Sequence, residues 1–361
     1  MKLEYIFAVF AVLAVIDKVF GNKFKLGDEF DRGISTAGPL ILSMSGMIVL
    51  APILADGISF IFRPVLEFLN IDLSMIATFF PSDAGGASMA YELSEDIKLR
   101  GYNGIVVASM FGATLCPVIP LSLQMVDKKY HDDVLVGLLC GIATIPLGCL
   151  VAGLIIGIEL LPLLLNTAPI IILSALICLG LVKAPDFVRK LLGIVGKLLM
   201  VLVTVGLGIG IIKTLCGFEI IRNTAPLEDS FKIIGNIVII LAGVFPLLSI
   251  ISRLFEKVFE KLGKLLEIDN GAVLGLVTSL ANSIPVFSMM GEYTSRGRIM
   301  NMAFAVSAAY VFGDHLAFAL SFDSSFALPM IVGKLIGGFS ALIIAHFVSK
   351  KKLKGHVSLP G

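Results

Sequence analysis

The sequence contains no tryptophan, and only 15% of its 361 residues carry a charge. Its five cysteines form no CxxC pair, and its four histidines do not combine with them at the spacing of a metal site. No HExxH, GxSxG or phosphate-binding loop is present. The sequence therefore contains no recognisable motif for a metal site, a cofactor or an enzymatic reaction. The net charge of +1 gives no electrostatic reason to expect a nucleic-acid partner.

The chain is unusually rich in apolar residues. Its residues are 57% hydrophobic, and the mean hydropathy is +0.99. Soluble domains are about 45–50% apolar and about 25% charged, so the excess indicates contact with lipid. Repeated apolar runs reach about 20 residues, the length that crosses the hydrocarbon core of a bilayer. The composition predicts an all-α polytopic membrane protein with about 10–11 transmembrane segments.

Nine apolar runs are candidate spans. They cover residues 3–20, 34–61, 103–125, 133–158, 165–183, 191–214, 232–252, 299–320 and 328–348. The first run lacks the basic region and the cleavage site of a secretory signal, so we interpret it as a retained span. The lysines of the run KKKLK at 350–354 favour a cytoplasmic position for that end of the chain, because cytoplasmic segments are enriched in basic residues.

Two further stretches, 65–97 and 255–293, begin as amphipathic segments, enter apolar runs and then break. The breaks fall at PSDAGG (81–86) and LANSIP (280–285). Proline and glycine loosen helical hydrogen bonding, and unwound backbone at membrane depth survives only inside protein or beside a wet cavity. We therefore expect re-entrant hairpins or broken helices at the centre of the molecule.

The chain also resembles itself. ELSEDIKLRGYNGIVVASMFG (92–112) is similar to EYTSRGRIMNMAFAVSAAYVFG (292–313), and polar matches keep their order over about a hundred residues. Shared apolar composition would explain the leucine and valine matches but not the polar ones. We therefore predict two transmembrane repeats, 1–160 and 161–350, followed by a short basic tail at 351–361. An odd number of spans in each copy would make the repeats inverted.

Asp83 is the first candidate for a functional side chain. A carboxylate inside a bilayer costs roughly 2.5–3.5 kcal/mol, so it is rarely present without a role. The repeat alignment pairs Asp83 with Asn282 or Ser283, so pseudo-symmetry would bring the two breaks together at a midplane site. Alternatively, Asp83 caps the half-helix that follows it.

The second candidate is the pair Asp314–His315, in the run FGDHLAFAL. It is either a structural hydrogen bond between helices or a counter-ion and proton relay, because histidine titrates near neutral pH. Asp83 and Asp314 could also form the dyad of an intramembrane aspartyl protease. That alternative requires a GxGD-type motif, of which FGDH is only a part.

Several long motifs resemble one known family. SLANSIPVFSMMGEYTSRGRIMNMAFAVSAAYVFGDHLAFAL, MIVLAPILADGI, SDAGGASMAYELS and TIPLGCLVAGLI are all similar to the ethanolamine permease family of the bacterial ethanolamine-utilisation pathway. The likeness covers nearly the whole chain. The family typically has a Cys-Asp-Met-Gly-Gly-like run where this chain has SDAGG, so the acid and the glycines are kept and the flanking residues differ.

The resemblance implies uptake of ethanolamine across the bacterial cytoplasmic membrane, and we expect neither a cofactor nor a metal. We expect facilitated uptake, because no chain of titratable residues leads from the Asp314–His315 pair to either face of the membrane. Ethanolamine is mostly an ammonium ion at neutral pH, and a desolvated cation requires an opposite charge. Asp83 is the first candidate for that partner and Asp314, beside His315, the second. The other candidate substrate-binding residues are Gly85, Gly86, Asn282, Ser283 and Phe287. A carrier of another small amine or amino acid, coupled to protons or sodium, stays open, as does a homo-oligomeric state.

Overall fold

The computed structural model describes residues 3–356, and every regular element in that range is helical. The all-α prediction is therefore confirmed. Residues 357–361 of the predicted basic tail lie outside the described range, while α17 continues to His356. The α-helices are α1 (Leu3–Val19), α2 (Leu26–Ile34), α3 (Ala37–Phe68), α4 (Ala87–Leu93), α5 (Ile97–Gly101), α6 (Ile119–Met125), α7 (His131–Ile142), α8 (Ile145–Ile156), α9 (Leu160–Lys183), α10 (Pro185–Cys216), α11 (Leu227–Leu254), α12 (Glu256–Leu266), α13 (Asn270–Ala281), α14 (Ile284–Met289), α15 (Ser295–Ala308), α16 (Asp314–Asp323) and α17 (Ala327–His356). The 3₁₀ and π-helical elements are η1 (Leu73–Phe79), η2 (Ser82–Gly86), η3 (Tyr102–Gly112), η4 (Thr114–Val118), η5 (Lys128–Tyr130), η6 (Met290–Glu292) and η7 (Ser324–Phe326).

Seven helical stretches in the described range are long and apolar enough to cross a membrane. They are Leu26–Phe68, Ile97–Met125, Lys128–Ile156, Leu160–Lys183, Pro185–Cys216, Leu227–Leu254 and Asp314–Lys352. The remaining predicted segments are shorter, such as α1 with 17 residues and α13 with 12. The chain is thus polytopic, and the short helix α13 ends at the interruption predicted at 280–285.

One predicted span is interrupted, contrary to expectation. The run 299–320 is not a single helix, because α15 ends at Ala308 and α16 begins at Asp314. Between them Tyr310 adopts a positive φ of 62°, a left-handed conformation that ends a helix. The apolar pattern continues through this break, so hydropathy alone could not reveal it.

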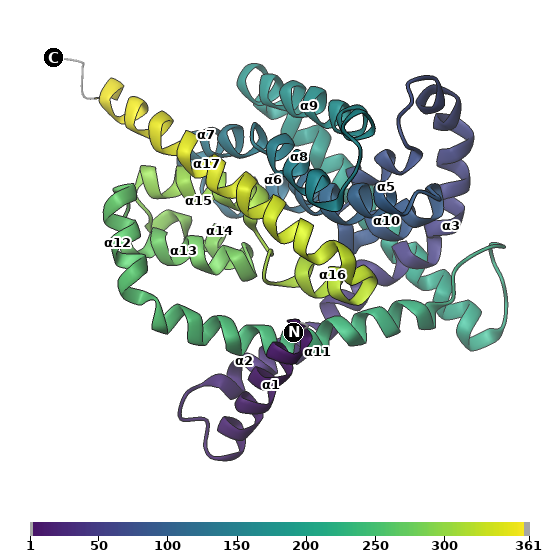
Figure 1. The fold of residues 1–361 in the computed structure, drawn as a ribbon, viewed down its shortest axis with the longest axis horizontal. Coiled ribbons are helices and arrows are strands. Elements are labelled where there is room, and N and C mark those ends of the chain that lie inside the picture. The colour runs from purple at the N-terminus through teal and green to yellow at the C-terminus, as the bar shows by residue number, and fades with distance from the viewer. Residues whose placement is uncertain (1–2, 357–361) are drawn as a thin grey trace.

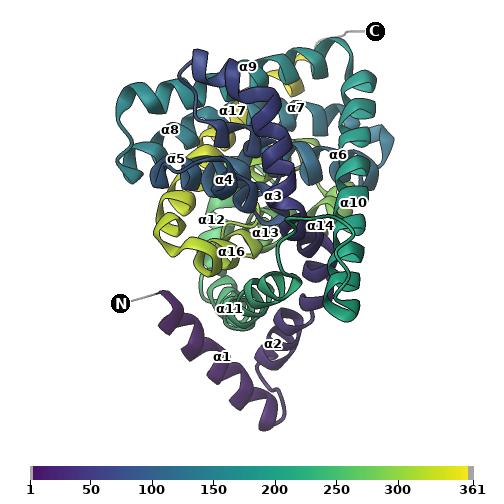
Figure 2. The same ribbon diagram turned by 90° about the vertical axis from the view of Figure 1, so that its right-hand side faces the viewer.

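Helix α11 crosses the molecule and carries the N-terminal hairpin of α1 and α2, which projects from the remainder in both views (Figure 1 and Figure 2). On the other side, α17 runs across α8 and α15, and α15 also packs on α7 (Figure 1). Glycines permit these close crossings. A Cβ at Gly148 of α8 would lie 2.4 Å from the Gly333 carbonyl oxygen of α17. Such spacing confirms the close helix packing expected of small residues in membrane proteins.

Candidate functional site

The first helix break holds Asp83. Phe80 and Pro81 are extended, Ala84 and Gly85 leave the helical φ/ψ range within η2, and α4 begins at Ala87 without a side-chain cap. Asp83 therefore lies ahead of that helix without capping it, contrary to the alternative drawn from the sequence. Gly85 has a φ of +107°, which a residue with a Cβ rarely adopts, and the added atom would lie 2.8 Å from the Met47 side chain. Asp83 is thereby held in irregular backbone, with its side chain 21% exposed.

The second break separates α13 from α14. Asn282 is extended, and its Oδ1 accepts a hydrogen bond of 2.9 Å from the Ile284 backbone N–H. Ser283 is buried, and its Oγ donates to the Tyr310 Oη at 2.9 Å. The two polar side chains at this break therefore already have partners within the protein.

A third irregular segment, 309–313, lies against the end of α13. The backbone N–H groups of Tyr310 and Phe312 donate to the carbonyl oxygens of Ser279 and Leu280, at 2.9 and 2.8 Å. A Cβ on Gly313 would lie 2.0 Å from the Ala281 carbonyl oxygen, so only glycine fits this approach. The segment places Asp314 and His315 in the first turn of α16.

These segments meet in a polar cluster, which we define as Asp83, Ser283, Tyr310, Asp314 and His315. The His315 Nε2 lies 3.9 Å from the Asp83 Oδ1, and the rings of Tyr310 and His315 have centroids 5.3 Å apart. The Tyr310 hydroxyl in turn accepts from Ser283. Tyr310 and His315 thus connect the first break, at Asp83, with the second break, at Ser283.

The partner of His315 differs from the one expected from its neighbour in the sequence. No hydrogen bond joins Asp314 to His315 among the described residues, and the imidazole faces Asp83 instead. The His315 Nδ1 and the Ser82 Oγ are both buried and have no hydrogen-bond partner in the described part of the chain. Asp314 precedes His315 in the first turn of α16. The cluster therefore combines two carboxylates with polar atoms that are free to bind a ligand.

The other sequence candidates lie at its edge. Gly86 allows close backbone packing, because its Cβ would lie 2.7 Å from the Phe80 carbonyl oxygen. Phe287 is 1% exposed in the first turn of α14, where its N–H donates to the Ser283 carbonyl oxygen at 3.1 Å. No contact in the structure places the Phe287 ring against Asp83.

Lys334 is a charged residue that the sequence did not assign to the site. An isolated lysine in an apolar run is typical of a side chain that extends to the membrane interface. In the structure it is instead 1% exposed, and its Nζ donates to the Ser109 carbonyl oxygen at 2.7 Å.

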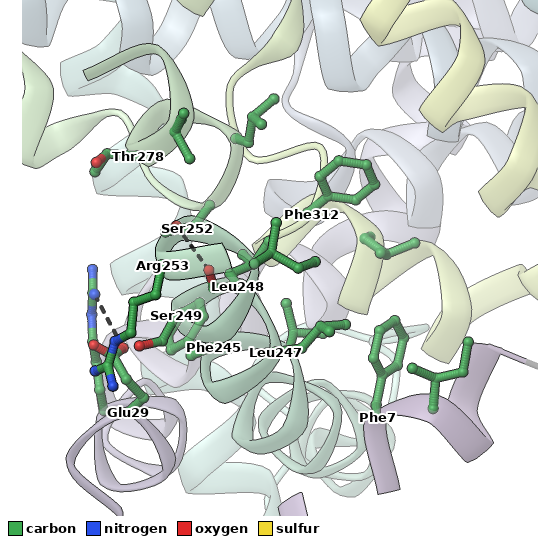
Figure 3. Close-up of a pocket in the computed structure, with 18 of the residues that line it drawn as sticks. Phe7, Glu29, Phe245, Leu247, Leu248, Ser249, Ser252, Arg253, Thr278 and Phe312 are labelled. Atoms are coloured by element: carbon green, nitrogen blue, oxygen red, sulfur yellow. Dashed lines mark hydrogen bonds and ion pairs between the residues drawn. The ribbon is translucent and has the colours of Figure 1, made fainter. Parts of the chain in front are cut away.

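A separate cavity of about 460 Å³ opens beside the cluster, between α1, α2, α11, α13 and α16 (Figure 3). Glu29 and Arg253 lie at one side of it, and Phe7 and Phe312 lie at the other. Most of its lining is apolar, and Asp83 does not contribute to it. The cavity is therefore distinct from the polar cluster.

The helical architecture defines a polytopic membrane protein, and its helix breaks bring two carboxylates and a histidine together. The family model described as ethanolamine utilisation protein, EutH, matches residues 2–348, so the chain belongs to the EutH family. No solved structure matches it.

Three curated relatives are similar to the chain over most of its length. It is 41% identical over 351 residues to the probable ethanolamine permease EutH of Listeria monocytogenes, covering 97% of this chain and 94% of that one. It is 35% identical to the probable ethanolamine permease EutH of Salmonella typhimurium, covering 96% and 95%. An uncharacterised Bacillus subtilis protein, YxeR, is also 35% identical, covering 96% and 94%. The chain is thus a multi-pass bacterial membrane permease rather than an enzyme, and the intramembrane protease alternative is not supported.

Proposed function

We propose that the chain carries ethanolamine, as its ammonium ion, across the cytoplasmic membrane by facilitated uptake. The observation that supports this proposal most directly is Asp83, a partly exposed carboxylate in a helix break within a membrane protein. The closest positively chargeable atom to it is the His315 Nε2, at 3.9 Å. A carboxylate at membrane depth without a close counter-ion favours the binding of a cation.

The polar cluster offers partners for both ends of the substrate. The three N–H donors of an ammonium ion suit Asp83, with Asp314 as the second carboxylate. The substrate hydroxyl both donates and accepts, which matches the unpartnered Nδ1 of His315 and Oγ of Ser82. Tyr310 also offers an aromatic face for a cation. The names of the relatives as probable ethanolamine permeases support the same substrate.

Uptake of labelled ethanolamine into proteoliposomes tests the proposal. Saturable uptake that alanine and choline do not compete for would support an ethanolamine carrier. Accumulation that requires an imposed proton or sodium gradient would instead support the alternative of an ion-coupled carrier. If uptake is absent, or if alanine competes equally, ethanolamine is not the preferred substrate.

We also propose that residues 1–160 and 161–350 are two inverted copies of one unit. Asp72 and Asp269 both cap a helix start and both accept a hydroxyl, from Ser94 at 2.7 Å and from Thr294 at 2.8 Å. The buried Asn103 and Asn301 each leave Oδ1 without a partner among the described residues. These matched contacts support a duplication, and an experimental structure in a bilayer would test it by the orientation of the two halves.

A further inference from the structure

Two groups of side chains connect residues 1–160 with residues 161–350 at places away from the polar cluster. The first, which we call the Tyr91 cluster, consists of Tyr91, Arg100 and Asp323. The Tyr91 hydroxyl donates to the Asp323 Oδ2 at 2.7 Å, and the Arg100 guanidinium carbon lies 4.5 Å from the centroid of the Tyr91 ring. This cluster ties α4 and α5 to the end of α16.

The second group, which we call the Asp133 cluster, consists of Tyr130, Asp133, Ser295, Arg298 and Lys352. Asp133 accepts hydrogen bonds from the Ser295 Oγ and from the Lys352 Nζ, both at 2.8 Å. It also accepts one from the Arg298 Nε at 2.9 Å, and the Arg298 guanidinium carbon lies 4.0 Å from the centroid of the Tyr130 ring. This cluster ties the start of α7 to α15 and to the end of α17.

The two clusters share a composition and a place in the proposed repeat. Each contains an arginine over a tyrosine ring, together with a carboxylate from the other half of the chain than the arginine. Arg100 stands three residues before Asn103, and Arg298 stands three residues before Asn301. Because the proposed repeat pairs these asparagines, it pairs the two arginines as well.

Helix α17, which runs across the molecule as one continuous helix (Figure 1), separates the two clusters. Phe326, directly before α17, packs beside Arg100, because a Cβ on Gly101 would lie 2.0 Å from the Phe326 ring. Lys352, near the other end of α17, belongs to the Asp133 cluster. The helix from Ala327 to Lys352 is about 38 Å long, which exceeds the roughly 30 Å of a hydrocarbon core. The clusters therefore lie toward opposite faces of the membrane.

The run of α7 and α8 leads to the same arrangement. The stretch Lys128–Ile156 is long and apolar enough to cross a membrane, and it begins at the Asp133 cluster. Directly after its end, the Gly157 carbonyl oxygen accepts a hydrogen bond of 2.7 Å from the Lys98 Nζ, two residues before Arg100. A second span thus has one cluster at each end.

The polar cluster lies between the other two along the chain. Helix α15 carries Arg298 in its first turns and ends shortly before Tyr310. Helix α16 then begins with Asp314 and ends with Asp323. A substrate bound at Asp83 would therefore have one of the two clusters on each side.

The clusters differ in how firmly they are held. The Arg298 and Asp133 side chains are each 10% exposed and form an ion pair. In the Tyr91 cluster, the Arg100 Nε is buried without a hydrogen-bond partner, and no ion pair joins Arg100 to a carboxylate among the described residues. A cation over a ring and one hydrogen bond are weaker than a buried, hydrogen-bonded ion pair, so the Tyr91 cluster is the easier one to open.

We propose that the two clusters are the closures at the two ends of the transport path, an inference that rests on the proposed function. The Tyr91 cluster opens to admit ethanolamine while the Asp133 cluster stays bonded. The Asp133 cluster then opens to release it on the side of the basic run 350–354, which we expect at the cytoplasmic face. Because a carrier exposes its site to one side at a time, the two clusters break in alternation.

Reversible cross-linking of each cluster in proteoliposomes tests the proposal. One full-length variant combines Tyr91→Cys with Asp323→Cys, and another combines Asp133→Cys with Ser295→Cys. A short bis-methanethiosulfonate reagent joins the two new thiols. Cross-linking either pair should abolish ethanolamine uptake, because that closure can no longer open, and a reductant should restore it.

The matched control combines Arg63→Cys with Glu67→Cys, whose native side chains pair at 3.5 Å on the single helix α3, and it should retain uptake after cross-linking. Uptake that continues after a complete cross-link at either closure, verified by mass spectrometry, would overturn the proposal. Absence of ethanolamine uptake by the wild type, which carries no cross-link, would instead overturn the proposed function.

If a double-cysteine variant takes up no ethanolamine before cross-linking, Tyr91→Phe and Asp133→Asn decide the question. Each weakens one closure and leaves the polar cluster intact. Native Cys116, whose Sγ lies 3.6 Å from the Phe79 carbonyl oxygen beside the first break, should then react faster with a maleimide, by about two- to tenfold for one lost hydrogen bond. Cys116→Ser identifies its part of the signal. An unchanged rate in either variant would overturn the closures.

Discussion

The two helix breaks differ in what their polar side chains do. At the first, Asp83 has no cap to form and no partner closer than 3.9 Å. At the second, Asn282 accepts from the Ile284 N–H and Ser283 donates to Tyr310, so both are already engaged. The two breaks, which the predicted repeat would pair, therefore differ in their side chains. The first presents a carboxylate, and the second has polar side chains that bond to the Ile284 backbone and to Tyr310.

The largest expected effect concerns the charge at the first break. We expect Asp83→Asn to weaken ethanolamine binding by about 30-fold or more, since losing one partner of a buried charge pair costs about 2–5 kcal/mol. Asn282→Ala, at the second break, should change affinity far less and mainly lower thermal stability, by about 0.5–1.5 kcal/mol, because the Ile284 N–H loses its acceptor. Calorimetry and thermal unfolding measure the two effects. Equal losses of affinity in the two variants would remove the distinction between the breaks.

The next largest effect concerns Gly112 and Gly313, the glycines that pack closely against the backbone at each break. A Cβ on Gly112 would lie 2.1 Å from the Phe80 carbonyl oxygen, as one on Gly313 would lie 2.0 Å from that of Ala281. Backbone cannot yield cheaply, so both alanine variants should lose about 1–3 kcal/mol of stability. Gly208→Ala on α10, where a Cβ meets nothing, is the matched control. Destabilisation at only one break would show that the two are supported differently.

A smaller effect is expected at His315, which connects the breaks. We expect His315→Gln to slow uptake by about two- to tenfold. The variant would lose the hydrogen bond proposed between His315 and the substrate hydroxyl, which is worth about 0.5–1.5 kcal/mol. Facilitated uptake also predicts that an imposed pH gradient does not drive accumulation in either protein. Proteoliposome assays with and without the gradient measure this. Gradient-driven accumulation that disappears in His315→Gln would instead assign a proton relay to the Asp83–His315 pair.

The smallest effect distinguishes Ser283, which precedes α14, from Ser288 within that helix. Ser283→Ala removes the donor to the Tyr310 hydroxyl and should weaken ethanolamine affinity by about fivefold, near 1 kcal/mol. Ser288→Ala removes an exposed hydroxyl that bonds only to the Pro285 carbonyl oxygen, and should have no effect. If the two variants behave alike, Tyr310 does not need Ser283 for its orientation.

The sequence predicted the helical class and both central breaks because composition and proline or glycine placement are local signals. It placed Asp83 in one break for the same reason. It missed the break at Tyr310, whose positive φ is stabilised by contacts with the end of α13, about 30 residues away in the chain. It also paired Asp314 with His315 because they are adjacent, whereas tertiary packing turns the imidazole toward Asp83. The burial of Lys334 was not predicted either, because nothing in the local sequence distinguishes it from a lysine that extends to the membrane interface.

The backbone contact between Gly148 and Gly333 has a mechanical consequence. Because no side chain separates α8 from α17 at this crossing, sliding one helix along the other would force carbonyl groups into collision. We therefore expect α8 and α17 to move together as one rigid unit during transport. Asp83 lies on η2, outside that unit, so the distance between α17 and the segment of η2 and α4 should change during transport. Distances between spin labels on α8 and α17 should then stay constant when ethanolamine is added, while those from α17 to α4 should change.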